Sequence, residues 1–145
     1  MAEIGLAASV IAVIQITAAA TAQVYNYGQN VKNAKEDLKC INRELEDLEK
    51  ILHKLQDLAQ RAEASGLPLE RWPTLVSLNE SDGPLKDCKI ALTELKSQLT
   101  PGKGKMSWFA ERMKWSYKKG KVEKSLQSIL KQKDAFIKSL DLDVA

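Results

Sequence analysis

The sequence predicts an all-α fold, a helical bundle of about four or five helices with an apolar helix at its N-terminus. Aromatic residues make up only 6% of the chain, whereas Ala, Leu, Lys and Glu are abundant, and this balance favours helices over strands. Two segments repeat apolar residues at alternating steps of three and four, which is the spacing of one helix face. A length of 145 residues supports one packed core and not two, so residues 1–145 are expected to form a single domain.

The first expected helix stands out because it carries no charge. The stretch between Glu3 and Lys32 contains no charged residue. From Ile4 to Ala22 the one strongly polar side chain is Gln15. A helix of these 19 residues would be about 28 Å long, close to the roughly 30 Å of a bilayer's hydrocarbon core. Its strongly apolar residues, the candidates for membrane insertion, are Ile4, Leu6, Val10, Ile11, Val13, Ile14 and Ile16.

Two interpretations of this helix stay open. Insertion free energies of about −0.3 to −0.6 kcal/mol per strongly apolar residue sum to roughly −2 to −4 kcal/mol, which is marginal for a constitutive anchor. A helix that is apolar on all sides is also typical of the buried centre of a bundle. A secretory signal is not expected, because Glu3 stands where a signal has basic residues. We therefore expect the helix to be sheltered in a resting chain whose mean hydropathy is −0.30, and to be released on activation.

The rest of the chain predicts three further long helices. The first of them carries a heptad stripe of Leu38, Ile41, Leu45, Leu48, Leu52, Leu55, Ala59 and Ala62. It ends at Ser65 and Gly66, and Thr74 to Asn79 can form one short turn in the connection that follows. The next helix starts at Asp82-Gly83-Pro84 and buries Leu85, Cys88, Leu92, Leu95 and Leu99. The last runs from about Gly120, with Val122, Leu126, Ile129, Phe136, Ile137 and Leu140 inward.

A basic segment precedes the last helix. The net charge is +3 for the whole chain, but residues 101–124 hold eight basic and two acidic residues, so the remainder is negative. Indole rings favour the headgroup region of a membrane, and each basic residue adds about 1 kcal/mol of binding to anionic lipid. The candidate lipid-binding residues are Lys103, Lys105, Arg112, Lys114, Lys118, Lys119, Lys121, Trp108 and Trp115. A solvated helix surface that never meets a membrane is the alternative.

Catalytic and nucleic-acid functions are not expected. The two cysteines, Cys40 and Cys88, are far apart and His53 is the single histidine, so no zinc-ligand spacing is present. There is no phosphate-binding glycine loop and no nucleophile with a base at a diagnostic spacing. No RNA- or DNA-binding motif accompanies the basic segment. The sequence thus predicts no enzyme and no cofactor.

Four parts of the chain, taken together, resemble a known family. They are Met1-Ala2-Glu3 with Gly5 to Gln15, Tyr25 to Val31 with Asn33-Ala34, Leu78-Asn79-Glu80 with Asp82 to Leu85 and Cys88, and Trp115 with Lys118 to Val122. Over nearly its whole length the chain resembles the fungal HeLo-like domains found at the N-termini of STAND/NLR-type receptors and of related cell-death effectors. Trp115-Ser116-Tyr117 departs from the Trp-Pro-Phe that is common in that family.

The resemblance implies a cell-death execution domain. Such domains are activated by a nucleotide-binding receptor or an amyloid signalling motif, in cis or in trans, and then oligomerise and drive the N-terminal helix into the plasma membrane. For this chain the resemblance implies insertion of the segment from Ile4 to Ala22, with anionic membrane lipids and further copies of the chain as partners. It also implies a cytoplasmic location at rest and the plasma membrane after activation.

A second class of function stays open beside this one. A non-lytic helical adaptor or oligomerisation module of an NLR-type receptor would use the same heptad faces to bind partner helices, without touching lipid. The two classes differ in their effect on vesicles, because an adaptor releases no vesicle contents.

Overall fold

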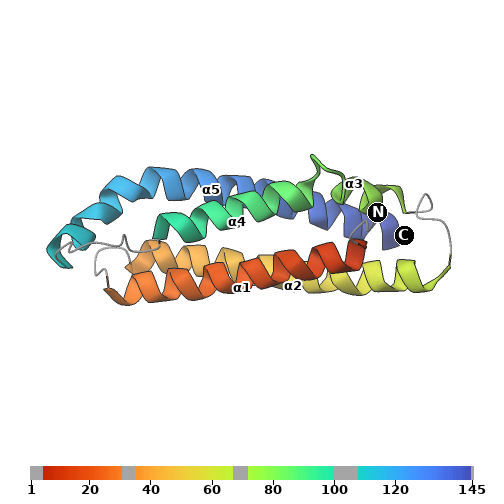
Figure 1. Cartoon of the computed structure of the whole chain (residues 1–145), viewed down its shortest axis with the longest axis horizontal. Helices are drawn as coiled ribbons and strands as arrows, with labels where there is room; N and C mark the ends of the chain where they lie inside the picture. The colour runs from red at the N-terminus through yellow and green to blue at the C-terminus, as the bar shows by residue number, and fades with distance from the viewer. Residues whose placement is uncertain (1–4, 31–34, 67–71, 100–107, 145) are drawn as a thin grey trace.

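Four long helices and one short helix make up the described chain. The computed structural model describes residues 5–30, 35–66, 72–99 and 108–144 (Figure 1). Its elements are α1 (Leu6–Asn30), α2 (Lys35–Ala64), α3 (Pro73–Leu78), α4 (Pro84–Leu99) and α5 (Trp108–Val144). These described residues contain no strand, so the predicted all-α bundle of four or five helices is confirmed.

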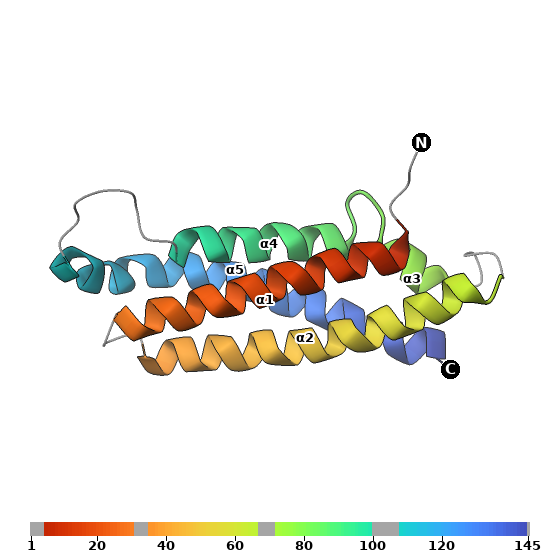
Figure 2. The ribbon, with the colours of Figure 1, turned by 60° about the horizontal axis from the view of Figure 1, so that its bottom comes forward.

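The long helices form an elongated four-helix bundle. The helix α1 packs against α2 and α4, and α5 packs against the same two helices from the other side. Figures 1 and 2 show α1 and α4 running in one direction and α2 and α5 in the other. The short α3 packs on α5 and α4, where the chain crosses from α2 to α4. Each long helix therefore buries one stripe and leaves the opposite face to solvent.

The heptad stripes predicted for α2 and α4 lie in the core, to which α1, α3 and α5 also contribute. All eight predicted residues of the α2 stripe are buried, and Leu45, Leu48, Leu52 and Leu55 are fully so. The predicted α4 residues are buried as well, including Cys88. Burial raises the pKa of the Cys88 thiol from 9.0 to about 12, because the core disfavours the charged thiolate. The predicted end of α2 is also confirmed, since Gly66 has the left-handed φ of 72° that favours glycine after a helix.

The last helix begins earlier than the sequence pattern indicates. It starts at Trp108, not near Gly120, and the Gly120 position has no atom within 4 Å of where a side chain would begin. Its buried residues are Trp115 and then, from Val122 onward, the apolar Val122, Ile129 and Phe136 in alternation with the polar Ser125, Gln132 and Ser139. Because three of these seven buried residues are polar, the helical period of α5 is weak in the hydrophobic pattern. Of the other predicted inward residues, Leu126, Ile137 and Leu140 are half-buried.

Candidate membrane-binding site

One face of α1 is buried in the bundle. Its buried residues follow the heptad spacing and are Leu6, Ala7, Val10, Val13, Thr17, Ala20, Val24 and Tyr27. Thr17 fits this face because its hydroxyl donates to the carbonyl of Val13, one turn earlier in the same helix, at 2.8 Å. The inward face is therefore mostly small, and it leaves no side-chain charge in the core.

The outward face of α1 is uncharged too. Its exposed residues are Ala8, Gln15, Ala18, Ala22, Tyr25, Asn26 and Gln29. The segment Leu6–Gln29 is long and apolar enough to cross a membrane, with a mean hydropathy of 1.6, and 33% of its most apolar window is buried.

The predicted inserting residues are divided between the two faces. Ile4 lies outside the described residues. Leu6, Val10 and Val13 are buried, whereas Ile11, Ile14 and Ile16 are half-buried. The interpretation of α1 as a helix buried on all sides is therefore wrong for its described part, because residues along one face, from Ala8 to Gln29, are exposed. One face of α1 is buried in the bundle, as expected for a sheltered helix. The exposed face carries small alanine side chains, which expose little apolar area to water.

The N-terminal end of α1 is capped by a side chain from α2. The backbone N–H of Ala7 donates to Oε1 of Glu63 at 3.0 Å. This carboxylate satisfies a first-turn N–H and places negative charge at the positive end of the helix dipole. Gly5 allows the close approach, since a Cβ there would lie 3.2 Å from the same Glu63 oxygen.

The C-terminal half of α1 is held by α4 and α5. The amide of Gln23 donates to the Leu99 carbonyl, at the end of α4, at 2.9 Å. The Tyr27 ring packs against Trp115 of α5 with centroids 5.9 Å apart and planes tilted by 53°. The ammonium of Lys118 lies 5.4 Å from the centroid of that tyrosine ring, within the range of a cation–π contact.

The predicted lipid-binding residues have different environments. Lys103 and Lys105 lie outside the described residues, as do the side chains of Trp108, Arg112 and Lys114. Lys118 is half-buried, whereas Lys119 and Lys121 are exposed. The prediction that the Trp115 indole lies on the membrane-binding surface is wrong for this structure. Trp115 is only 4% exposed, because its ring fills the contact between α5 and the end of α1.

The sequence prediction missed Asp37 at this end of the bundle. Its Oδ2 accepts a hydrogen bond from the indole Nε1 of Trp115 at 3.2 Å and lies 3.4 Å from the Lys119 ammonium. One cluster of side chains thus joins α1, α2 and α5. Its members are Tyr27, Asp37, Trp115, Lys118 and Lys119. The only local signal for Asp37 is its place in the first turn of α2, where an acidic residue favours the helix dipole.

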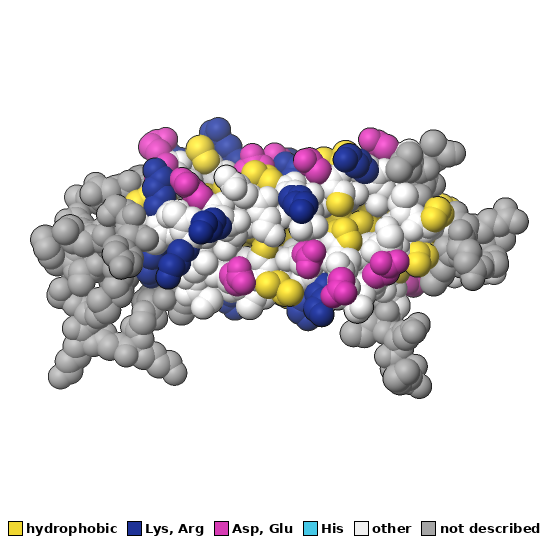
Figure 3. Space-filling model, turned by 90° about the horizontal axis from the view of Figure 1, so that it is seen from above, with side chains coloured by type: hydrophobic (Ala, Val, Ile, Leu, Met, Phe, Trp, Pro, Cys, Tyr) yellow, Lys and Arg dark blue, Asp and Glu magenta, His cyan; other side chains and the backbone are white. Residues whose placement is uncertain are grey.

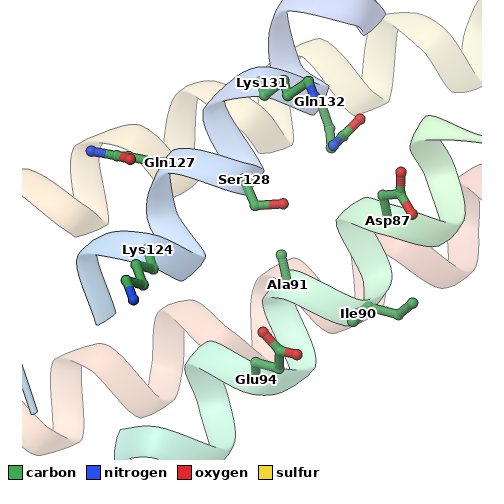
Figure 4. Close-up of a pocket in the computed structure, with 9 residues that line it drawn as sticks. All are labelled: Asp87, Ile90, Ala91, Glu94, Lys124, Gln127, Ser128, Lys131 and Gln132. Atoms are coloured by element: carbon green, nitrogen blue, oxygen red, sulfur yellow. The ribbon is translucent and has the colours of Figure 1, made fainter. Parts of the chain in front are cut away.

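A groove lies elsewhere, between α4 and α5. It has a volume of about 660 Å³ and is open to solvent on the face where charged and hydrophobic side chains are interspersed (Figure 3). Figure 4 shows Ala91 and Ser128, two small side chains, facing each other between the helices, and this explains the gap. Asp87 and Glu94 line its α4 side, and Lys124 and Lys131 line its α5 side. In the part of the chain that the structure describes, no three His, Cys, Asp or Glu residues are placed to hold a metal ion.

Comparison with known proteins identifies a family. No curated protein and no solved structure matches the chain. Residues 1–107, which contain α1 to α4, match the family described as pigment biosynthesis cluster protein PigL N-terminal. The match covers well over half of the chain, so this protein belongs to the PigL N-terminal family.

Proposed function

We propose that this protein is a membrane-targeting cell-death execution domain that oligomerises on activation and inserts α1 into the plasma membrane. The observation that carries the proposal is the character of α1, a 25-residue helix without charge that is attached to the bundle along one face. Such a helix can leave the bundle without moving a charged side chain into the bilayer.

The position of the basic residues supports the proposal. Lys118 and Lys119 lie beside the C-terminal end of α1, and the exposed Lys121 follows them on α5. Anionic lipid attracts exposed lysines with about 1 kcal/mol each, so this end of the bundle would meet the inner leaflet first. An end-on approach would bring α1 to the membrane surface before it is released.

Family membership supports the finer identity as a HeLo-like domain. The PigL N-terminal family is a fungal domain family that is often linked to HeLo-like domains. Under this proposal the chain is cytoplasmic at rest, is activated by an NLR-type or amyloid-signalling partner in cis or in trans, and acts at the plasma membrane as an oligomer.

The test is a dye-release assay with the purified chain and vesicles that contain anionic lipid, comparing the parent with Ala18→Lys. Ala18 is exposed in the bundle and central in the Leu6–Gln29 segment, so lysine there leaves the core intact. At a bilayer centre the same lysine costs about 2.5–3.5 kcal/mol, comparable to the whole favourable insertion free energy. Gln60→Lys is the control, because Gln60 is equally exposed but lies on α2.

We expect the parent and Gln60→Lys to release dye at similar protein concentrations. Ala18→Lys should need at least a tenfold higher protein concentration, because its insertion cost exceeds the 1.4 kcal/mol that corresponds to about tenfold. Circular dichroism checks that each variant remains helical. Release by a folded Ala18→Lys at parent concentration contradicts insertion of α1. No release by any of the three, at any concentration of anionic lipid, favours the non-lytic adaptor instead.

A further inference from the structure

We propose that the Trp115 indole N–H and the Lys119 ammonium form an anion-binding site that Asp37 occupies in the resting chain and that a phospholipid phosphate occupies at an anionic membrane. This inference rests on the proposed function and specifies how its basic end recognises lipid. In the resting chain the Asp37 carboxylate acts as an internal substitute for the phosphate.

The geometry is that of a site built around a single oxygen atom. Trp115 and Lys119 are one turn apart on α5, and both donors converge on Oδ2 of Asp37, at 3.2 Å and 3.4 Å. Trp115 is 4% exposed, so its ring is held in place by packing. A buried indole N–H needs an acceptor, and an anionic oxygen is a strong one.

The anion in this site is open to replacement from solvent. The Lys119 side chain is 46% exposed and the Asp37 side chain 43%. A second α2–α5 ion pair among the described residues, Lys133 with Glu44, has a similar length of 3.2 Å but is less exposed, at 17% and 36%. That second pair involves no indole donor among the described contacts. Among the ion pairs between α2 and α5 that the structure describes, the Asp37 site therefore combines a buried indole N–H, an exposed ammonium and access for a second anion.

Exchange of the anion would loosen α1. Asp37 lies in the first turn of α2, directly after the connection from α1, and ties this turn to α5. The same Trp115 ring packs on Tyr27, near the end of α1, and the Lys118 ammonium lies 5.4 Å from the centroid of that tyrosine ring. A phosphate that takes the place of Asp37 binds the released form more tightly than the resting form, and this difference is what shifts the equilibrium.

Binding to vesicles tests the site through a matched pair of variants. Asp37→Asn removes the internal anion, and Glu44→Gln removes the same charge from the comparable pair on the same two helices. Co-sedimentation with vesicles of phosphatidylserine and phosphatidylcholine measures affinity, and phosphatidylcholine vesicles give the neutral-lipid baseline. We expect Asp37→Asn to bind anionic vesicles about fivefold more tightly than Glu44→Gln, the effect of one additional free basic residue near such a surface.

A second pair of variants tests the cation. Lys119→Gln and Lys121→Gln each remove one exposed positive charge, but only Lys119 contacts Asp37. If the site takes lipid phosphate, Asp37→Asn strengthens binding in the parent and in Lys121→Gln, and has no such effect in Lys119→Gln. A purely additive electrostatic effect of Asp37→Asn on all three backgrounds overturns the site.

The indole N–H distinguishes lipid phosphate from free phosphate. Its NMR resonance is assigned by its loss in Trp115→Phe. In the parent we expect short-chain phosphatidylserine, but not inorganic phosphate or phosphatidylcholine, to shift this resonance. In Asp37→Asn inorganic phosphate shifts it as well. No shift in Asp37→Asn with either anion overturns the site, and so does a parent that responds equally to both. These readouts involve no dye release, so failure of this site and failure of membrane insertion are separate results.

Discussion

The helices α1 and α2 lie side by side and run in opposite directions, yet their two faces are built from different residues. The buried stripe of α2 is largely leucine, and its outer face carries the charges of residues such as Arg43, Asp47 and Lys50. The buried stripe of α1 contains valine, alanine and threonine beside one leucine and one tyrosine, and its outer face has no charge.

The different faces of α1 and α2 determine which of the two helices can leave the bundle for a membrane. Burial of a full leucine side chain contributes about 1.5–3 kcal/mol, so the α2 stripe is strongly attached to the core. Its charged outer face also keeps α2 in water, because charges are costly in a bilayer. The smaller side chains of α1 bury less apolar area per turn, and its outer face is compatible with both water and lipid. We infer that α2 stays in the bundle, whereas α1 can leave it for the bilayer.

Truncation of one core side chain in each helix should change stability most. Leu52 of α2 and Val13 of α1 are both buried. Leu52→Ala is expected to lower the free energy of unfolding by about 2–5 kcal/mol, and Val13→Ala by about 1–2.5 kcal/mol, because fewer methyl groups are lost. Urea denaturation followed by circular dichroism measures both values.

Leu52→Ala and Val13→Ala also test which helix leaves the bundle during dye release. If α1 leaves the bundle to act, Val13→Ala should lower the protein concentration needed for vesicle dye release, since it weakens only the α1 contact. Leu52→Ala should instead reduce the amount of folded protein and not favour release at equal folded concentration. A Val13→Ala variant that is destabilised as much as Leu52→Ala, with unchanged dye release, contradicts the distinction between the two helices.

The repeating stripes were predictable from the sequence, but the contacts that define the candidate site were not. The leucines of α2 and α4 repeat with helical spacing, so those helices and their core faces were visible. The faces of α1 were not distinguished, because neither face carries a charge. The start of α5 is misplaced at Gly120, because this glycine and the lysines beside it interrupt the apolar pattern, whereas the helix continues through the exposed glycine.

Trp115 shows most clearly why the site needed a structure. Lysines follow it closely in the sequence, and this favoured a membrane-surface interpretation. Its burial depends on Tyr27 and its hydrogen bond on Asp37, which is 78 positions away in the sequence. Local charge patterns do not contain such long-range pairings, and only the packing of α1, α2 and α5 creates them.

A smaller effect is expected where α2 holds the first turn of α1. Glu63→Ala removes the acceptor of the Ala7 N–H and should lower stability by about 0.5–2 kcal/mol, the range for a lost helix cap. Glu46→Ala is the control, because Glu46 is exposed on the outer face of α2. Hydrogen exchange should be faster at the first-turn amides of α1 in Glu63→Ala and unchanged in the control. Equal exchange in both variants would show that this cap does not restrain α1.

The last prediction uses Cys88 as a reporter and disturbs the bundle least. Cys88 is buried on α4, which packs against α1, whereas Cys40 is exposed on α2. Alkylation requires the thiolate, and the pKa of about 12 keeps the buried Cys88 thiol protonated at pH 8. Cys88 therefore reacts only in molecules whose core has opened, where its pKa returns toward the ordinary value of 9.0.

The rate of Cys88 alkylation relative to Cys40 then measures the open fraction. If α1 detaches while α2, α4 and α5 stay together, Cys88 reacts faster than the global free energy of unfolding permits, because a local opening costs less than unfolding the whole chain. Val13→Ala should increase this excess, and Leu52→Ala should raise the rate only in proportion to its global destabilisation. A Cys88 rate that matches global unfolding in the parent and in both variants would mean that α1 and α2 open as one unit, and that the uncharged face of α1 does not make it separable.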